Sequence, residues 1–311
     1  MYYHLSKTRN FALLFLIILM LTATSCDYSQ TDIDLSRYEF RDTKKLVKFA
    51  YHAAEIIRKK GITCIDSFKK NRDNFGNNDF YLYIYKFDGE NLFHAGIKEF
   101  EGQNLADVLD LDGKAIHKSV ITALENKQNP HAWVHYNWWK PKRFYPVPKS
   151  SCHFKVITDE GGKLYVGAGM DFPHEEKEFI RIIVDTAVDL IQEKGKEALE
   201  KLKDPTCQFI YREVRVFVFD DEGKTLISPV LNYSPVEINF LESKDAAGHK
   251  PFERALTSLK DRDSTWEVFL AKSRSRRILL KKILYLRKIK LNDEIIYVGA
   301  VTDMPEPAWT N

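Results

Sequence analysis

The sequence lacks the motifs that identify the common enzyme classes. It contains no G-x-S-x-G nucleophile elbow, no phosphate-binding loop and no H-E-x-x-H zinc motif. Its histidines do not have the spacing of zinc ligands, and no glutamate follows Asp110 and Asp112 to complete a calcium-binding EF-hand loop. We therefore expect no enzymatic activity, no metal site and no cofactor.

A strong charge imbalance is also missing. The chain has 47 basic and 44 acidic residues and a formal net charge of +3 in 311 residues, which gives no case for nucleic-acid binding. One local excess of basic residues lies at 272–277 (KSRSRR), close to Lys281 and Lys282. This segment is typical of a solvated hairpin, and the alternative is a contact with anionic lipid headgroups or an acidic partner.

Long hydrophobic runs are absent after residue 26, and the run before it is short. Lys7 and Arg9 precede an apolar run at residues 11–21, whereas a helix needs roughly 20 apolar residues to span a bilayer. Residues 1–25 are therefore predicted to be a signal peptide, with an uncleaved membrane anchor as the alternative.

Residues 23–26 (ATSC) resemble the lipobox of bacterial lipoproteins. The resemblance implies cleavage before Cys26 and lipid on its sulfur and amine, so acyl chains would hold the protein on the periplasmic side of a membrane. Asp27 follows, and in enterobacterial lipoproteins an acidic residue there implies retention at the inner membrane. Residues 26–41 have few apolar groups and predict a flexible, solvated tether.

Few cysteines remain for the folded part of the chain. With Cys26 assigned to lipid, Cys64, Cys152 and Cys207 are left. The periplasm permits disulfides, but three cysteines leave one unpaired, and their spacings do not suit zinc. We expect core thiols, with one disulfide plus a free thiol as the alternative.

The chain contains two similar halves. Residues 83–89 (YIYKFDG) recur about 134 positions later as 217–223 (FVFDDEG), and 166–173 (VGAGMDFP) recur as 298–305 (VGAVTDMP). Short solenoid repeats have periods of about 20–50 residues and are excluded. The pattern predicts a duplicated domain: module 1 at residues 42–173, module 2 at 174–305, and a tail at 306–311.

Each half shows the same order of predicted elements. Apolar residues at helical spacing predict amphipathic helices at residues 42–60 and 178–194. Alternating β-branched and aromatic residues then predict a hairpin, followed by a short helix and a meander of strands. The expected fold class is α+β with an antiparallel sheet in each module.

The motif order of the first half resembles a known family, the Cache domains, and within it the Cache_2 type of bacterial chemoreceptors and sensor kinases. The resemblance rests on Y-x-Y-x-x-D-G at 83–89, then 102–105 (GQNL), 110–114 (DLDGK), an aromatic strand at 133–138 (WVHYNW), and 148–151 (PKSS) before the closing VGAG. It implies a PAS-like fold in each module, with a curved antiparallel sheet, a long N-terminal helix and a pocket on one face. Ligands in this family are small metabolites, often short carboxylates.

The same resemblance implies the site residues of module 1. Tyr136 and Trp138 would line the pocket, and Lys149 would meet a ligand carboxylate. Tyr81 or Tyr83 would form the floor of the pocket, and His94 would be a further contact. The predicted ligand-binding residues are therefore Tyr136, Trp138, Lys149, His94, Tyr83 and Tyr81. Cys152 and His153 depart from the family pattern, which leaves the ligand class open.

Module 2 lacks most of these features. By alignment Phe269 replaces Tyr136, Ala271 replaces Trp138, Ser228 replaces His94, and Lys281 is matched to Lys149. Module 2 is therefore predicted to be structural.

The predicted function is that of a periplasmic, lipid-anchored sensor, without a nucleic-acid partner. It would bind a small carboxylate-containing metabolite in module 1 and signal through a partner protein in the envelope. The alternative is a structural or scaffolding lipoprotein that binds no ligand.

Overall fold

The computed structural model describes most of the chain after residue 32. The described residues are 33–76, 80–126, 131–139, 145–204, 206–212, 214–229, 238–272 and 279–304. The predicted signal peptide, Cys26 with Asp27, basic residues 273–277 and the tail at 306–311 lie outside them. Among the described residues, no helix combines the length and apolarity that crossing a bilayer requires.

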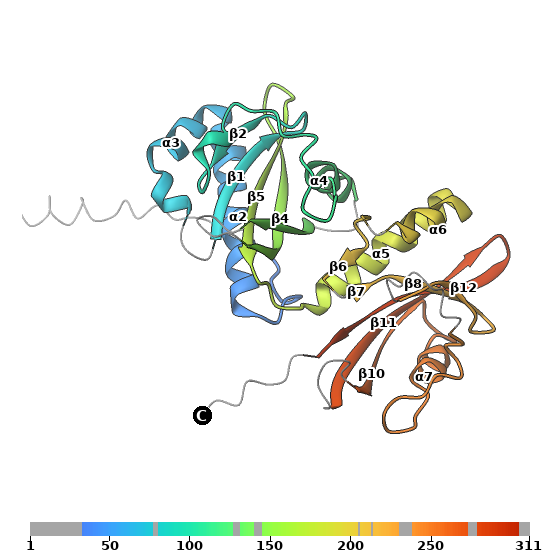
Figure 1. The fold of residues 1–311 in the computed structure, drawn as a ribbon. Helices are drawn as coiled ribbons and strands as arrows, with labels where there is room; N and C mark the ends of the chain where they lie inside the picture. The colour runs from blue at the N-terminus through green and yellow to red at the C-terminus, as the bar shows by residue number, and fades with distance from the viewer. Residues whose placement is uncertain are drawn as a thin grey trace, which may run out of the picture. The chain divides into compact units, whose positions relative to one another are not determined.

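The first half of the chain forms a five-stranded antiparallel sheet with the order β2-β1-β5-β4-β3 (Figure 1). Its strands are β1 (Phe80–Lys86), β2 (Asn91–His94), β3 (Ala132–Trp139), β4 (Pro146–Ile157) and β5 (Lys163–Asp171). Its helices are α2 (Arg41–Lys60), α3 (Ile65–Lys70) and α4 (Ile116–Glu125), with 3-10 turns η1 (Ile62–Cys64), η2 (Arg72–Phe75) and η3 (Lys98–Phe100).

Helix α2 packs on β4 and β5 at one face of this sheet. Its apolar stripe includes Leu46, Ala50 and Ile57, which are at most 1% exposed. The helix ends at Gly61, whose N–H donates to the carbonyl of Ile57 at 2.8 Å and whose φ is +69°. A residue with a Cβ adopts this φ only with strain, so glycine fits the position.

Strand alternation gives the two faces of the first sheet different chemistry. Directly paired residues of neighbouring strands point to the same side. Leu82 pairs with Ala168, and both are fully buried in an aliphatic row. One residue further along, Tyr83 pairs with Gly167, which pairs with His153, and this row lies on the opposite face.

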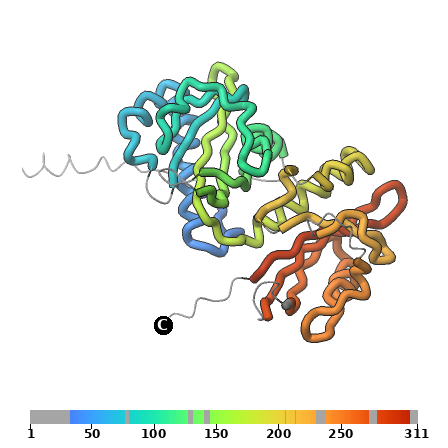
Figure 2. The backbone as a smooth tube through the Cα atoms, viewed as in Figure 1, coloured from blue at the N-terminus to red at the C-terminus, as the bar shows by residue number. Residues whose placement is uncertain are grey.

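The second half forms another five-stranded antiparallel sheet, with the order β10-β11-β12-β8-β9. Read in reverse, from β9 to β10, this order corresponds to that of the first sheet: β9, β8, β12, β11 and β10 take the places of β2, β1, β5, β4 and β3. Its strands are β8 (Phe217–Asp220), β9 (Thr225–Ile227), β10 (Ser264–Lys272), β11 (Leu279–Leu291) and β12 (Glu294–Asp303), beside a small hairpin of β6 (Ile210–Tyr211) and β7 (Val214–Arg215). Its helices are α5 (Lys177–Lys194), α6 (Lys196–Lys203) and α7 (Pro251–Ser258). The tube in Figure 2 runs from blue to green through the first half of the chain and from yellow to red through the second, and the two strand orders have no strand in common.

Helices α5 and α7 cover opposite faces of the second sheet. Helix α5 packs on β11 and β12, where Asp185 accepts a hydrogen bond from Tyr285 at 3.1 Å. Helix α7 packs on the other face, where Phe252 lies against Phe217 and Phe219.

The segment before α2 is packed, which corrects part of the predicted tether. Tyr38 is 1% exposed, and its hydroxyl accepts a hydrogen bond from the indole N–H of Trp133 at 2.8 Å and lies 2.5 Å from Nε2 of His131. Phe40 stacks on His174 with ring centres 4.1 Å apart. These two aromatic rings attach the segment to the folded chain, with Tyr38 buried and Phe40 half-buried, so the prediction of a solvated tether does not hold for these two residues.

The α+β class is confirmed, and the predicted helices agree with α2 and α5 to within one residue at each end. The alignment of lysines across the two halves was wrong by one position. Strand register places Lys149 opposite Tyr136 and Asp171, and it places Lys282 opposite Phe269 and Asp303. Lys282, rather than Lys281, is therefore the counterpart of Lys149, because a shift of one residue in a strand moves a side chain to the other face.

Candidate functional site

The first sheet carries a cavity of about 200 Å³ on the face opposite α2. Strand residues, including His94 at the end of β2, supply one wall, and the segment from η3 to α4 supplies the other. The strand wall is aromatic and polar: Tyr81, Tyr83, Tyr85, His94, Tyr136, Trp138, His153 and Tyr165. The opposite wall is mainly apolar and includes Ile97, Phe100, Leu105, Val108, Ile116 and Val120.

Two glycines of β5 make the strand wall possible. A Cβ at Gly167 would lie 2.7 Å from Cδ2 of His153 and 2.7 Å from Cζ of Tyr83, so the rings occupy the space that a side chain would need. A Cβ at Gly169 would lie 3.6 Å from the hydroxyl oxygens of both Tyr81 and Tyr136. The glycines therefore let the aromatic rings lie directly on the backbone and bring two hydroxyl groups together.

His94 presents a hydrogen-bond donor for which the described part of the chain offers no acceptor. Its Nδ1 accepts the backbone N–H groups of Gly96 at 3.2 Å and Ile97 at 2.9 Å. An imidazole that accepts at Nδ1 carries its proton on Nε2. Burial lowers the pKa of His94 to about 3, with Arg72 and Lys149 adding to the effect. At neutral pH the ring is therefore an uncharged donor at the cavity wall.

Two further histidines of the cavity hold tyrosine hydroxyls. Nε2 of His153 lies 2.9 Å from the hydroxyl of Tyr83, and burial lowers the pKa of His153 to about 3. His117 donates from Nε2 to the carbonyl of Phe87 at 3.1 Å, so its Nδ1 accepts from the hydroxyl of Tyr165 at 3.0 Å. These contacts fix the orientation of both tyrosine rings.

The tyrosines of the cavity are uncharged at neutral pH. Burial raises the pKa of Tyr81, Tyr83 and Tyr136 far above the ordinary value. The hydroxyl groups of Tyr81 and Tyr136 both lie over Gly169. The wall thus offers hydroxyl groups that can donate, without any formal charge of their own.

Lys149 lies beside the cavity and is not part of its lining. Strand β4 places it opposite Tyr136, and its fully buried ammonium forms an ion pair with Asp171. The ammonium also lies 5.4 Å from the ring centre of Tyr81. Its charge is compensated by Asp171, and among the residues that line the cavity it lies against Tyr81 and pairs across the sheet with Tyr136.

Five of the six predicted site residues line the cavity. Tyr81, Tyr83, His94, Tyr136 and Trp138 come together there, and Lys149 is the residue that stands behind the wall.

The predictions missed Tyr85, His117, His153 and Tyr165 as lining residues. Alternation along the strands would have placed Tyr85 on the face of Tyr83, and Tyr165 on the face of Gly167. His117 comes from α4, and its position depends on packing that no strand pattern specifies.

The equivalent face of the second sheet is packed with apolar side chains. Register places Leu286 where His153 stands, since each pairs with the glycine of the closing strand, Gly299 or Gly167. By the same register Val301 stands in place of Gly169. These residues belong to one buried cluster, which contains Phe217, Phe219, Phe240, Phe252, Ala255, Leu259, Leu284, Leu286 and Tyr297, with Phe269 and Val301 against it.

The cysteines and possible metal ligands add no chemistry to the site. Cys64 and Cys152 are buried free thiols and Cys207 is half-buried, which agrees with the expectation of core thiols. No group of three or more His, Cys, Asp or Glu side chains in the described residues is arranged to hold a metal ion.

Several solved structures are similar to parts of this chain. A periplasmic sensor domain of a chemotaxis protein is 20% identical, with a TM-score of 0.33 over 42% of this chain and 92% of that chain. A Cache chemosensory domain, described in a study of carboxylic acid recognition, is 19% identical, with a TM-score of 0.31 over 42% of this chain and 88% of that one. The ligand-binding domain of the amino acid chemoreceptor PctB of Pseudomonas aeruginosa, in complex with L-Arg, is 9% identical, with a TM-score of 0.29 over 84% of this chain and 87% of that one.

The search of curated proteins found no match. The family model dCache_2, described as a Cache domain, matches residues 44–304. This range includes both sheets and most of the sequence, and the chain therefore belongs to the dCache_2 family of Cache domains.

Proposed function

We propose that the protein is a sensor-type receptor of the cell envelope and that its first sheet binds a small carboxylate-containing metabolite. The observation that carries this proposal is the contrast between the two sheets. The first has an open cavity of about 200 Å³ with polar groups in its wall, and the same face of the second is filled by phenylalanine and leucine. Membership of the Cache family supports a sensory, ligand-binding role rather than an enzymatic one.

The cavity suits a small ligand with one polar end. A cavity of about 150 Å³ holds benzene, so about 200 Å³ admits a molecule that is somewhat larger. The apolar wall near Leu105 and Val120 would contact the hydrocarbon part. The Nε2–H of His94 and the hydroxyl groups of Tyr81 and Tyr136 would face the polar end.

A carboxylate matches these groups because it only accepts hydrogen bonds. His94 has a donor without an acceptor among the described residues, and an ammonium group placed there would meet a second donor. A hydrogen bond to a charged group contributes about 1.5–3 kcal/mol. The ammonium of Lys149, behind the tyrosines, adds a favourable field that Asp171 reduces.

We further propose that the two sheets are tandem copies of one module and that the second is structural. The signal peptide, the lipid at Cys26 and the partner protein belong to the same proposal. A lipid anchor on the periplasmic side, at the inner membrane if Asp27 acts as a retention signal, would keep the receptor near a partner that carries the signal onward.

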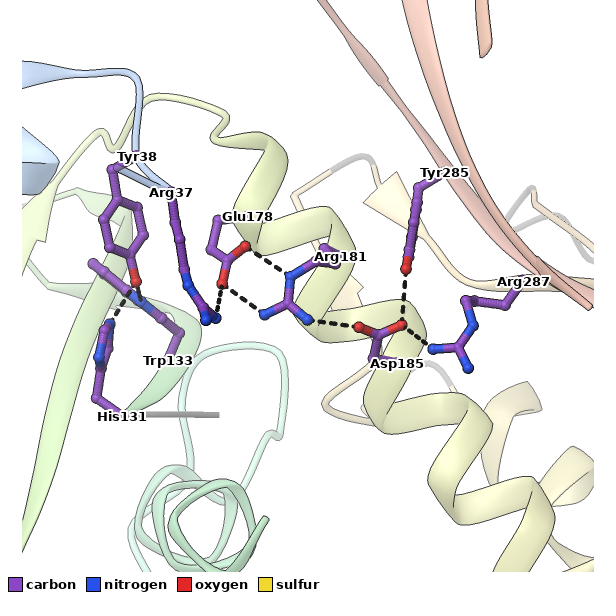
Figure 3. A network of polar contacts seen from close by, with 9 residues as sticks. All are labelled: Arg37, Tyr38, His131, Trp133, Glu178, Arg181, Asp185, Tyr285 and Arg287. Carbon is purple, nitrogen blue, oxygen red and sulfur yellow. Dashed lines mark hydrogen bonds and ion pairs between the residues drawn. The ribbon is translucent and has the colours of Figure 1, made fainter. Parts of the chain in front are cut away.

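Two groups of polar contacts, joined by the backbone between Arg37 and Tyr38, lie along the path from the first sheet to the second (Figure 3). Tyr38 contacts the start of β3, and its neighbour Arg37 lies 3.5 Å from Glu178 at the start of α5. Along α5, Arg181 links Glu178 at 2.6 Å to Asp185 at 2.7 Å. Asp185 then bonds Tyr285 and Arg287 of β11. A change in the position of β3 on ligand binding would therefore bear directly on the helix that packs on the second sheet.

The test is ligand-dependent stability of the purified chain. A panel of short mono- and dicarboxylates, their uncharged amides and the amino acids is screened for a rise in unfolding temperature. A ligand at 100 times its Kd adds about 2.7 kcal/mol to the free energy of unfolding. We expect carboxylates to stabilise the protein and the matching amides to be weaker.

Variants locate the site and decide between receptor and scaffold. His94→Gln and Tyr136→Phe should reduce the ligand-induced shift, and Phe269→Leu in the second sheet should leave it unchanged. If no compound in the panel stabilises the protein, the structural lipoprotein without a ligand becomes the better reading.

A further inference from the structure

A second hollow runs along the outer edge of β3, away from the apolar wall of the cavity. This cleft of about 420 Å³ is lined by Asp112 and Lys114 of the turn at residues 110–114, the end of β3, the start of β4, Thr206, and β6 with Arg212 after it. Tyr136 contributes to the walls of both hollows. The proposed sensor site makes no use of the cleft.

Lys114 is the reason to expect an occupant. The residue is 8% exposed, and its ammonium donates to the carbonyl of His135 at 2.7 Å and to that of Ile210 at 3.0 Å. An ammonium has three donors, and within the described residues neither a third acceptor nor a carboxylate within 4.0 Å is found for it. A buried charge without a counterion is unfavourable. Burial lowers the pKa of Lys114, and Asp110 opposes this effect only in part.

Arg212 adds a second cation to the wall of the cleft. Its Nη1 donates to the carbonyl of Pro173 at 3.2 Å and lies 3.5 Å from a carboxylate oxygen of Glu175. That separation is long for a charge-assisted hydrogen bond, and a guanidinium has five donors. The backbone of Arg212 has a φ of +55°, a region that residues other than glycine seldom adopt. Such positions are often associated with function.

The other charged groups of the wall already have partners. Asp112 accepts a hydrogen bond from the side-chain amide of Asn137 at 2.5 Å, and Lys149 is paired with Asp171. The carboxylate of Asp110 accepts three backbone N–H groups, including that of Lys114 at 2.7 Å. The unmatched chemistry in the cleft is therefore positive and donates hydrogen bonds.

We propose that this cleft is a second binding site, specific for a small anion whose oxygens accept from Lys114 and Arg212. Carboxylates and inorganic oxyanions share this chemistry, and a planar carboxylate also fits the fork of a guanidinium. The site is separate from the cavity and does not depend on the sensor proposal. Tyr136 lines both hollows, so a ligand in one that shifts this ring would change the affinity of the other.

The experiment uses the full chain with sodium sulfate or sodium acetate as the probe, at constant ionic strength set with sodium chloride. Unfolding temperature is followed as the probe concentration rises. We expect a saturable increase with at least one probe, and at least a tenfold weaker apparent affinity in Arg212→Gln. Arg254→Gln is the matched control, because Arg254 pairs with Glu267 at the second sheet, away from the cleft.

Each outcome has a definite meaning. If the unfolding temperature saturates with sulfate but not with acetate, the ligand of the cleft is an inorganic oxyanion. If it saturates with acetate, and this binding is kept in His94→Gln but weakened in Arg212→Gln, the ligand is a carboxylate bound in the cleft. Lys114→Met should weaken the same binding; if that variant does not fold, Arg212→Gln still decides. A rise that never saturates, or one that is equal in Arg212→Gln and the parent chain, overturns the proposal.

Discussion

Replacing Gly167 by alanine should damage both stability and ligand binding. The new Cβ would come within 2.7 Å of Cδ2 of His153 and closer still to the ring of Tyr83. Real Cβ atoms do not approach other atoms so closely, and both rings are buried, so they must shift together. Overpacking of this kind costs about 1–3 kcal/mol. For a protein of this size each kcal/mol lowers the unfolding temperature by roughly 2–4 °C.

Replacing Gly169 by alanine should separate the two effects. Here the Cβ would lie 3.6 Å from the hydroxyls of Tyr81 and Tyr136 and 3.7 Å from Cβ of Ser151, which are ordinary contact distances. Loss of a strand glycine also reduces the entropy of the unfolded chain and stabilises by about 0.4–1 kcal/mol. Stability should be unchanged or slightly higher. The added methyl lies at the polar end of the cavity, where we expect about tenfold weaker binding or more, since one methylene in a pocket changes affinity by about 1–3 kcal/mol.

The assay is urea unfolding of each variant with and without the best carboxylate from the panel, read as a change in midpoint at constant slope. Gly299→Ala is the matched control in the second sheet, where a Cβ would lie 2.8 Å from Leu286 and 2.9 Å from Phe217. It should lose stability as Gly167→Ala does but keep the full ligand-induced shift. If both single variants, Gly167→Ala and Gly169→Ala, bind the ligand normally, the placement of the ligand's polar end against β5 is refuted.

The remaining predictions concern buried charge. Asp185→Asn should lower the free energy of unfolding by about 2–4 kcal/mol in urea titrations, because it removes the carboxylate that pairs with the partly buried Arg287 and one of the two carboxylates that pair with Arg181. Protonation of His94 opposes folding, since its pKa of about 3 in the folded state lies below the ordinary 6.5. The folded state is therefore unaffected by His94 above pH 6.5 and loses about 2 kcal/mol of stability at pH 5, because the unfolded chain takes up a proton there that the buried ring does not. His94→Gln should lose that much less stability between pH 7.5 and 5. Equal acid sensitivity of the variant and the parent chain would contradict this. Lys149→Met should destabilise more than Lys282→Met in thermal unfolding, because the Lys149 side chain is 0% exposed and that of Lys282 is 29% exposed.

The elements and the site wall were largely readable from the sequence. Helical periodicity predicted α2 and α5, because each buries one continuous stripe on a sheet. Tyr136 and Trp138, two positions apart in β3, share the face that lines the cavity, as the family resemblance implied. Local patterns sufficed here because a strand of period two fixes which side chains share a face.

Long-range packing is what the sequence did not reveal. The polar segment before α2 looked solvated, yet Tyr38 is held by Trp133 and His131, more than ninety positions away. The match of Lys149 to Lys281 failed because sequence similarity in this region is too weak to fix a strand register, and hydrogen-bonded pairing sets it at Lys282. Both errors concern contacts between segments that are distant in the sequence, and local composition does not predict such contacts.

A lysine–aspartate pair occurs in both sheets, buried in the first and partly exposed in the second, and this bears on which residues open the cavity of the first sheet. Lys149 pairs with Asp171, and Lys282 pairs with Asp303 at the same register. A pair present in the hollow sheet and in the filled one fits a role in fastening the fourth and fifth strands of each. Some of the residue types that change between the sheets are the ones that open the cavity.

Those changes all lie on the cavity face. Gly169 is answered by Val301 and His153 by Leu286, so the first sheet gains space and hydrogen-bonding groups at the same two places. His94 supplies the donor whose acceptor is missing from the described residues. If ligand recognition depends on this face, His94→Gln should weaken carboxylate binding more than Lys149→Met does at equal stability, as measured by titration calorimetry. The opposite order would mean that the ammonium leaves Asp171 to meet the ligand, and that the tyrosine wall moves when it does.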